Sequence, residues 1–330
     1  MEPITPFLTT CKLARKQSYK NLTVFPVLAP NGTQPDYLIL EQGLDQNLVQ
    51  VTELDQAGSV PELRLRNKGK KKLLIVEGEE LVGARQNRIV NATFLVAGNT
   101  EIVIPVSCVE QGRWHYASHE FTSGKKMMHA SLRRNHQADV KFSLNRGEGY
   151  RSNQGRIWED IEGKLDRMQV ASATAALSDA YESYEERLFS YLEKFSVMEW
   201  QCGAVFAING RVLGLEAFSC SDTFAAFFDR LVRSYALDAL DWEKDARETN
   251  VAPQNARRFI QSAANSKGDS HPSIGLGENV AMESKSVSGA ALVEKGRVVH
   301  LSAFIKEAAG GFGTHHVRYQ RFSQRRQNRY

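Results

Sequence analysis

Cysteine is scarce in this sequence, and long apolar runs are absent from it. The four cysteines, Cys11, Cys108, Cys202 and Cys220, form no CxxC pair, which argues against a disulfide framework and against a zinc knuckle. No window approaches the ~18 uncharged apolar residues that span a bilayer, and the first twenty residues carry four basic side chains without an apolar core. We therefore expect no membrane association, no secretory signal and a cytoplasmic location.

Metal-ligand spacing is also missing. His115, His119, His129 and His136 lie in a polar stretch and match no ligand spacing on a regular element. The glycines that follow residue 309 lack the lysine and the helix of a phosphate loop. No segment matches the signature of an enzyme class. We therefore expect no metal and no cofactor, and the function has to be inferred from smaller groupings of residues.

The composition is that of an ordinary folded protein. Hydrophobic residues make up 42% of the 330 residues and charged residues 24%, and this length allows one large or two ordinary domains. The net charge of +4 is concentrated in a basic tail at 311–330. This tail is either a solvated terminus or a weak contact for nucleic acid, because its arginines are interleaved with aromatic residues. These arginines are Arg318, Arg321, Arg325, Arg326 and Arg329.

Residues 1–120 are expected to form a β-rich domain. Short strand-like runs such as 22–28, 48–53 and 89–96 alternate with turn clusters that contain Asn and Gly. Many short strands at this spacing favour a sandwich or a jelly roll over a parallel sheet. Residues 121–155 are basic, contain several glycines and lose this pattern, so we expect a flexible connector there.

Residues 156–310 are expected to form helices and an antiparallel sheet. Apolar residues recur at helical spacing in 157–168 and 174–192. Residues 203–218 are typical of a hairpin around an Asn-Gly turn, and 289–304 agree with them at eight of sixteen positions. We expect the two hairpins to occupy comparable places in one sheet covered by helices, which makes the whole chain an α+β protein.

The densest polar grouping lies in two segments of the β-rich region, EGEELVGARQNR at 77–88 and SCVEQGRWH at 107–115. Strand parity places Glu110 on the inward face, at the end of a row of apolar residues. An unpaired buried carboxylate costs several kcal/mol. Glu110 is therefore expected to pair with Arg88, with Arg113 or with backbone donors.

Two interpretations of this grouping remain open. Arginine holds carboxylates and phosphates through two parallel hydrogen bonds, and tryptophan offers a flat face for a ring or a guanidinium, so the segments are candidates for a pocket that binds an anion. The other interpretation is a structural network of ion pairs at one end of the β-rich domain. The candidate ligand-binding residues are Gln86, Asn87, Arg88, Glu110, Arg113 and Trp114.

The same segments resemble a known family. GEELVGARQNR and PVSCVEQGRWHY are similar to motifs of the bacterial family named for its association with ADP-ribosylglycohydrolases and rhodanese-phosphatases, and a looser likeness continues through 200–240 and 288–304. The resemblance implies a cytoplasmic prokaryotic protein tied to ADP-ribose or NAD-linked systems by gene neighbourhood, and it implies no catalytic mechanism. The residues that match the motif are Gly78, Glu80, Gly83, Gln86, Asn87, Arg88, Cys108, Glu110, Arg113 and Trp114.

Two classes of function are compatible with these observations. The first is a binding or sensor protein that recognises a nucleotide or an ADP-ribose-type anion. The second is a hydrolase that acts on such a ligand, with Glu110 or Glu80 as general base. Cys108 is a further candidate as a nucleophile, although a small cysteine among valines is more often a filler of the core. We favour binding because no acid–base pair is recognisable in the sequence.

Overall fold

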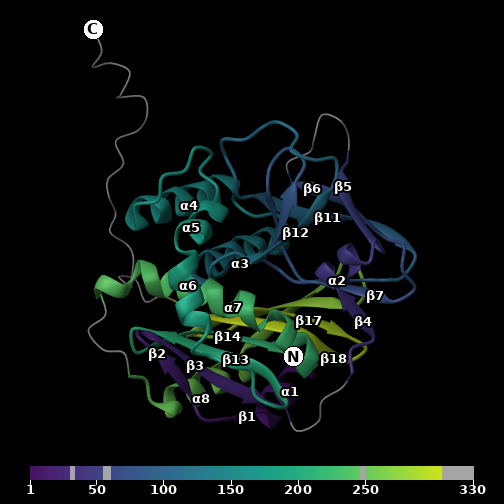
Figure 1. Cartoon of the computed structure of the whole chain (residues 1–330). Coiled ribbons are helices and arrows are strands. Elements are labelled where there is room, and N and C mark those ends of the chain that lie inside the picture. The colour runs from purple at the N-terminus through teal and green to yellow at the C-terminus, as the bar shows by residue number, and fades with distance from the viewer. Residues whose placement is uncertain (30–33, 55–60, 246–249, 307–330) are drawn as a thin grey trace.

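The largest element of the fold is an antiparallel sheet of nine strands. The computed structural model describes residues 1–29, 34–54, 61–245 and 250–306 (Figure 1). Along the sheet the strands follow the order β1-β3-β13-β14-β18-β17-β16-β15, and β2 pairs with β3. The strand bounds are β1 (Lys12–Leu13), β2 (Gln17–Tyr19), β3 (Leu22–Leu28), β13 (Gln201–Ile208), β14 (Arg211–Phe218), β15 (Lys267–Pro272), β16 (Glu278–Glu283), β17 (Val287–Glu294) and β18 (Arg297–Ile305).

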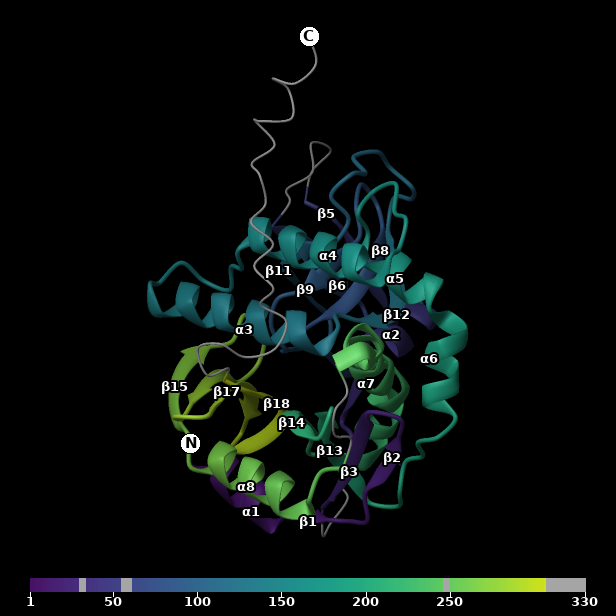
Figure 2. The same ribbon diagram turned by 90° about the vertical axis from the view of Figure 1, so that its left-hand side faces the viewer.

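Helices cover both faces of this sheet (Figure 1, Figure 2). The long helix α7 (Ser221–Asp241) lies on one face, where residues such as Phe224 and Leu231 recur at helical spacing and are buried against the strands. The short helix α1 (Ile4–Thr10) and helix α8 (Pro253–Ala264) lie on the other face and enclose a second apolar cluster. The central strands of the large sheet are therefore buried on both sides, whereas the edge strand β15 is largely exposed.

The two hairpins with similar sequences are neighbours in the large sheet, as the sequence predicts. Strands β13 and β14 form the first hairpin, β17 and β18 form the second, and β14 pairs with β18. In this pairing Glu216 lies opposite Ser302, and the two residues occupy equivalent positions of the repeated sequence. The hairpins are thus related by an approximate two-fold axis that passes between Glu216 and Ser302.

The β-rich part of the chain forms two smaller sheets that enclose a common apolar core. One has the order β10-β7-β4, with β4 and β7 parallel, and the other has the order β12-β8-β9-β11-β6-β5. The molecule is an α+β protein with a β-rich N-terminal part. The bounds are β4 (Tyr37–Ile39), α2 (Leu40–Asp45), β5 (Val49–Glu53), β6 (Glu62–Asn67), β7 (Lys72–Ile75), β8 (Glu79–Gly83), β9 (Arg88–Val90), β10 (Phe94–Val96), β11 (Thr100–Cys108) and β12 (Phe121–Met127).

The structure differs from the expected division at residues 1–120, because the first strands belong to the large sheet. Strand β3 lies between β1 and β13, and the smaller sheets begin only at β4. The sequence of β3, LTVFPVL, is apolar almost throughout, and its first six residues are buried, which is typical of a strand covered on both faces. Strands β5 and β6 instead alternate between more and less buried residues, as strands with one covered face do.

The segment 121–155, expected to be a flexible connector, contains two regular elements. Strand β12 pairs with β8, and helix α3 (Ala130–Asn145) packs against α7 and β17. Several polar residues of α3 are buried, among them Arg133, His136 and Gln137. Polar side chains that face inward leave the helix without a continuous apolar stripe, and its sequence therefore looks like that of a linker.

Helices α4 (Gln154–Met168), α5 (Leu177–Ser183) and α6 (Glu185–Leu192) pack beside α7, and the short turn η1 (Glu243–Asp245) follows α7. They correspond to the two predicted helical runs, the second of which is broken at Tyr184. No helix in the described part of the chain is long and apolar enough to cross a membrane. The basic tail at 311–330 lies outside the described residues.

Candidate functional site

The structure brings most of the predicted site residues together at the junction of β9 with the loop after β11. Gln86 Nε2 donates to the Glu110 carbonyl oxygen over 2.9 Å, and the Asn87 backbone N–H donates to Glu110 Oε2 over 3.1 Å. Arg113 Nε donates to the same carboxylate oxygen over 2.8 Å, and its Nη2 donates to Asn87 Oδ1 over 2.9 Å. The buried ion pair that strand parity predicts for Glu110 is therefore present, with Arg113 as its partner.

Both members of this ion pair form further hydrogen bonds with other groups of the protein. Arg113 Nη1 donates to the Ala84 carbonyl oxygen over 2.8 Å, and the second carboxylate oxygen of Glu110 accepts a hydrogen bond from Thr174 Oγ1 over 3.2 Å. The network thus joins three segments that are distant in sequence. In this arrangement the pair connects these three segments, and ligand binding by these residues stays a prediction.

Arg88 has a different environment from Arg113. Its fully buried guanidinium donates from Nη1 to Gln86 Oε1 over 2.9 Å, and Nη2 lies 4.0 Å from a Glu53 carboxylate oxygen. Nε and Nη2 have no hydrogen-bond partner among the described residues, and burial lowers the pKa of this guanidinium. The nearby Cys108 thiol is also buried, and burial raises its pKa, which opposes formation of the thiolate that a nucleophile requires.

Trp114 lies apart from this cluster, on the surface. Its side chain is 48% exposed, and the guanidinium carbon of Arg85 lies 5.3 Å from the centre of its ring. The same guanidinium lies 4.8 Å from the ring centre of Tyr116. Of the two partners predicted for the flat face of Trp114, a ring or a guanidinium, the structure places a guanidinium of the protein itself there.

Glu80, a candidate general base, is buried beneath β12. A Cβ added to Gly124 would come within 2.7 Å of Glu80 Oε2, so the glycine backbone covers the carboxylate. Burial raises the pKa of Glu80 to about 7, close to the value that suits proton transfer at neutral pH. A groove of ≈ 720 Å³ runs over Gly124 between β12 and α7, and its lysines and arginines are paired with acidic neighbours. A ligand there has to displace these ion pairs.

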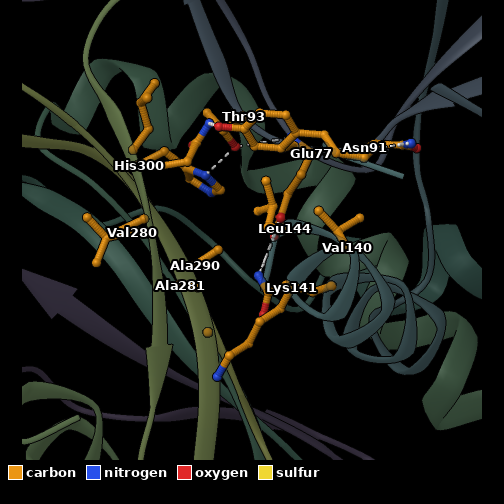
Figure 3. A pocket seen from close by; sticks show the side chains of 17 residues that line it. Glu77, Asn91, Thr93, Val140, Lys141, Leu144, Val280, Ala281, Ala290 and His300 are labelled. Atoms are coloured by element: carbon orange, nitrogen blue, oxygen red, sulfur yellow. Dashed lines mark hydrogen bonds between the residues drawn. The ribbon is translucent and has the colours of Figure 1, made fainter. Parts of the chain in front are cut away.

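A second cavity lies where α3 meets the large sheet (Figure 3). Helix α3 contributes Gln137, Val140, Lys141 and Leu144, which share one helix face because their spacing follows the helical period. Strands β16 to β18 form the opposite wall, and residues from the segments beside β7 and β10 close one end. We call it the interface cavity, because its walls come from both the smaller sheets and the large sheet. Its polar lining includes Glu77, Asn91, Thr93, Tyr150, Asn279 and His300.

Glu77 places a carboxylate in the interface cavity. Gln137 Nε2 donates to Glu77 Oε1 over 3.0 Å, and the Ser302 hydroxyl donates to the same oxygen. Burial raises the pKa of Glu77. The backbone turns sharply after it, since Gly78 has a φ of +79° and a Cβ there would lie 2.8 Å from Arg133 Cδ. Only glycine fits this turn without strain, which explains the glycine of the EGEE segment.

Thr93, His300 and Glu216 form a row beside Glu77. Thr93 Oγ1 lies 2.8 Å from His300 Nδ1 and accepts a hydrogen bond from the Glu77 backbone N–H over 3.1 Å. The Thr93 hydroxyl can donate to Nδ1 in the tautomer that carries its hydrogen on Nε2. Nε2 faces Glu216 Oε2 across 3.8 Å, too far for a direct hydrogen bond. Neither atom has a hydrogen-bond partner within the described ranges.

The register of the large sheet explains why these groups meet. Glu216 pairs with Ser302, and His300 lies two residues from Ser302 on the same face of β18. Arg133 Nη1 lies 2.8 Å from Glu216 Oε1, and the Tyr235 hydroxyl donates to that oxygen over 3.0 Å. A carboxylate, an imidazole and a guanidinium thus converge near the approximate two-fold axis. Nowhere in the described chain do three or more His, Cys, Asp or Glu side chains form a group that could hold a metal ion.

The sequence reasoning missed this group because its members come from five separate segments. One signal was present: His300 interrupts the apolar run RVVHLSAF, and Glu216 interrupts the similar run RVLGLEAF. Both residues are buried in the structure, and buried polar groups need partners. A polar residue in the middle of an apolar strand is therefore a candidate site residue.

The fold and the interface cavity define an α+β protein with a buried polar site between two β units. The chain belongs to the family described as the ARG and Rhodanese-Phosphatase-superfamily-associated Protein domain, whose model matches residues 10–304. This match confirms the resemblance carried by the GEELVGARQNR and PVSCVEQGRWHY segments. Comparison with curated proteins and with solved structures finds no match.

Proposed function

We propose that the protein is a binding or sensor protein that holds the polar end of a small ligand in the interface cavity. The observation that carries this proposal is the convergence of Glu77, Thr93 and His300 at one end of a cavity with largely apolar walls (Figure 3). Such walls with a few convergent polar groups are typical of small-molecule sites between two structural units. Because the walls belong to both units, a bound ligand favours one arrangement of them, as a sensor requires.

The chemistry of the cavity supports a ligand with hydroxyl or amide groups at one end and negative charge at the other. Glu77 and Thr93 offer partners for hydroxyl groups, while the Lys141 ammonium group lies at the opposite end (Figure 3). Lys141 pairs with the exposed Glu283, so a phosphate at this end has to share or displace that carboxylate. The cavity of ≈ 30 Å³ holds roughly two water molecules, so a larger ligand has to separate α3 from the strands as it enters. A ribose inside and a phosphate near Lys141 fit this division, and the family resemblance supports an ADP-ribose-type nucleotide.

The second candidate function is hydrolysis of the same ligand. Thr93, His300 and Glu216 follow the order of a hydroxyl, a base and a carboxylate that orients the base. Glu77, whose pKa is raised by burial, is the acidic residue among the described residues that line the cavity. As the general base we therefore propose His300 or Glu77 in place of Glu80 and Glu110.

We further propose that the protein acts in the cytoplasm of a bacterium. The family resemblance supports this location, and so do the four cysteines, which are free thiols in the structure, the state that a reducing compartment maintains. A weak nucleic-acid contact through the arginines of 318–329 remains part of the proposal. Loss of polyanion binding after deletion of 318–330 tests it.

Calorimetric titration with ADP-ribose, NAD and ribose 5-phosphate, with chromatography of the mixtures afterwards, tests both functions. Thr93→Val keeps the shape of the side chain and removes its hydroxyl, so we expect binding to weaken roughly two- to tenfold, the loss of about 0.5–1.5 kcal/mol expected for one hydrogen bond. Thr122→Val on the exposed part of β12 is the matched control. Lys141→Ala is expected to weaken binding of the phosphate-bearing ligands.

The outcomes distinguish a binding protein from a hydrolase and test whether the site lies in the interface cavity. Absence of binding by the parent protein, or unchanged binding by both Thr93→Val and His300→Gln, refutes a site in the interface cavity. Heat without product supports a binding protein. Product formed by the parent and lost in His300→Gln, while binding is retained, supports hydrolysis with His300 as the base.

A further inference from the structure

Two of the four cysteines lie side by side, although 190 residues of sequence separate them. Cys11 ends helix α1 directly before strand β1, and Cys202 lies in β13 at a shift of its register with β3. Their sulfur atoms are 4.0 Å apart and within hydrogen-bond reach. A disulfide requires about 2.05 Å, so the sulfurs have to approach by roughly 2 Å.

The backbone at Cys11 can accommodate such an approach. Strand β1 has only two residues and forms the edge of the large sheet. Helix α1 ends at Thr10, and Cys11 already has an extended conformation. The Cys11 thiol donates to the Phe7 carbonyl oxygen over 3.1 Å, a single weak hydrogen bond that has to break as the sulfur moves. Short edge elements with few backbone hydrogen bonds shift at low cost. Cys202, by contrast, is fixed inside a strand buried on both faces.

The two thiols differ in solvent exposure and in pKa. Cys202 is fully buried, whereas Cys11 is partly exposed and lines a surface hollow of ≈ 500 Å³ that also includes Lys12 and Arg257. The hydrogen bond from Cys202 lowers the pKa of Cys11, and the same contact together with burial raises the pKa of Cys202. A reagent from solvent therefore meets Cys11 first, and Cys11 is the thiol that more readily becomes a thiolate.

We propose that Cys11 and Cys202 form a peroxide-sensitive dithiol, with Cys11 as the reacting thiol and Cys202 as the resolving thiol. The Cys11 thiolate attacks one oxygen of hydrogen peroxide, the O–O bond breaks, and Cys11 becomes a sulfenic acid while the other oxygen leaves as hydroxide. The Cys202 sulfur then attacks the sulfenic sulfur. The S–O bond breaks as the S–S bond forms, and the hydroxyl leaves as water with the proton of Cys202. A dithiol reductant reverses the product to two thiols.

The test treats the full chain with near-stoichiometric hydrogen peroxide and maps its peptides without reduction. We expect a linkage between Cys11 and Cys202 that dithiothreitol reverses, while Cys108 and Cys220 stay reduced because both are buried. In Cys202→Ser the reaction is expected to stop at the sulfenic acid of Cys11, which dimedone traps. In Cys11→Ser no residue is expected to react with dimedone.

The mapping of the parent protein decides the proposal even if a variant folds poorly, and Cys202→Ala provides a second resolving-thiol variant. Absence of the Cys11–Cys202 linkage at peroxide levels that give the dimedone adduct in Cys202→Ala overturns the pairing. Oxidation of Cys108 or Cys220 as fast as Cys11 overturns the assignment of Cys11 as the reacting thiol. Cys108 and Cys220 serve as internal controls in every sample.

Discussion

Removal of the Arg113 guanidinium distinguishes a structural role of the motif from a ligand-binding role. Glu110 is only 7% exposed, and Arg113→Ala removes the cationic partner of its carboxylate. It also removes the donors to the Ala84 carbonyl oxygen and to Asn87 Oδ1, which lie 2.8 and 2.9 Å from the guanidinium. These buried acceptors then lose their hydrogen bonds from the guanidinium, and water has little access to replace them.

The expected cost follows from the geometry of this ion pair. Breaking a buried pair by removing one partner costs about 3–5 kcal/mol, and Arg113 contacts Glu110 Oε2 through two nitrogens at 2.8 and 2.7 Å. The double change Glu110→Gln with Arg113→Met removes both charges. We expect it to be less destabilised than Arg113→Ala, because no unpaired charge remains in the interior.

Urea denaturation followed by circular dichroism measures these free energies of unfolding. The matched control is Arg156→Ala, because Arg156 pairs with Asp139 over 3.0 Å but its side chain is 47% exposed, and exposed pairs contribute up to about 1 kcal/mol. A loss below about 1 kcal/mol for Arg113→Ala refutes the structural role. If that stable variant also loses nucleotide binding measured by calorimetry, the anion pocket predicted from the sequence is supported instead.

Three further predictions concern buried groups outside this pair. Burial lowers the pKa of His136 from 6.5 to about 4, so the unfolded chain takes up the proton first as the pH falls. The free energy of unfolding of the parent protein should therefore drop by up to about 3 kcal/mol between pH 6.5 and 4. His136→Gln should not show this drop when both proteins are unfolded in urea. Gly78→Ala should cost about 1–3 kcal/mol in the same assay, and Gly147→Ala less, because both glycines have positive φ but only Gly78 is crowded. Lys164→Met should cost about 3–5 kcal/mol, because it removes the ammonium group 2.8 Å from the fully buried Asp238. In acid that penalty should shrink as Asp238 protonates, which unfolding curves at several pH values would show.

Local patterns in the sequence predict the elements whose stability is local. The Asn-Gly hairpin at 203–218 and its echo at 289–304 are confirmed as neighbours in one sheet, because turn chemistry and alternation depend on adjacent residues. The placement of β3 depends instead on which distant strand it pairs with. Its unbroken apolar run indicates burial on both faces, but this run does not identify the partner.

The candidate site shows the same limit. The pairing of Glu110 with an arginine is predictable, because a buried carboxylate needs a partner and Arg113 is only three residues away. The interface cavity is not, since Thr93 and His300 are 207 residues apart in the sequence and their contact depends on how the sheets and α3 pack together. The polar character of α3, which looked like a linker, is what equips the cavity with Gln137 and Lys141.

The acidic residues of the EGEE segment explain how one short motif can couple the interface cavity to the packing of the molecule. Strand alternation and the turn at Gly78 send three carboxylates in different directions: Glu77 reaches β18, Glu79 accepts a hydrogen bond from Arg230 of α7 over 2.9 Å, and Glu80 lies beneath β12. A ligand that changes the contacts of Glu77 therefore acts on the same four residues that hold α7 and β12. If a ligand binds in the cavity as proposed, the EGEE segment is the contiguous packed connection from the cavity to α7 and β12, because a close-packed turn does not move without shifting its neighbours.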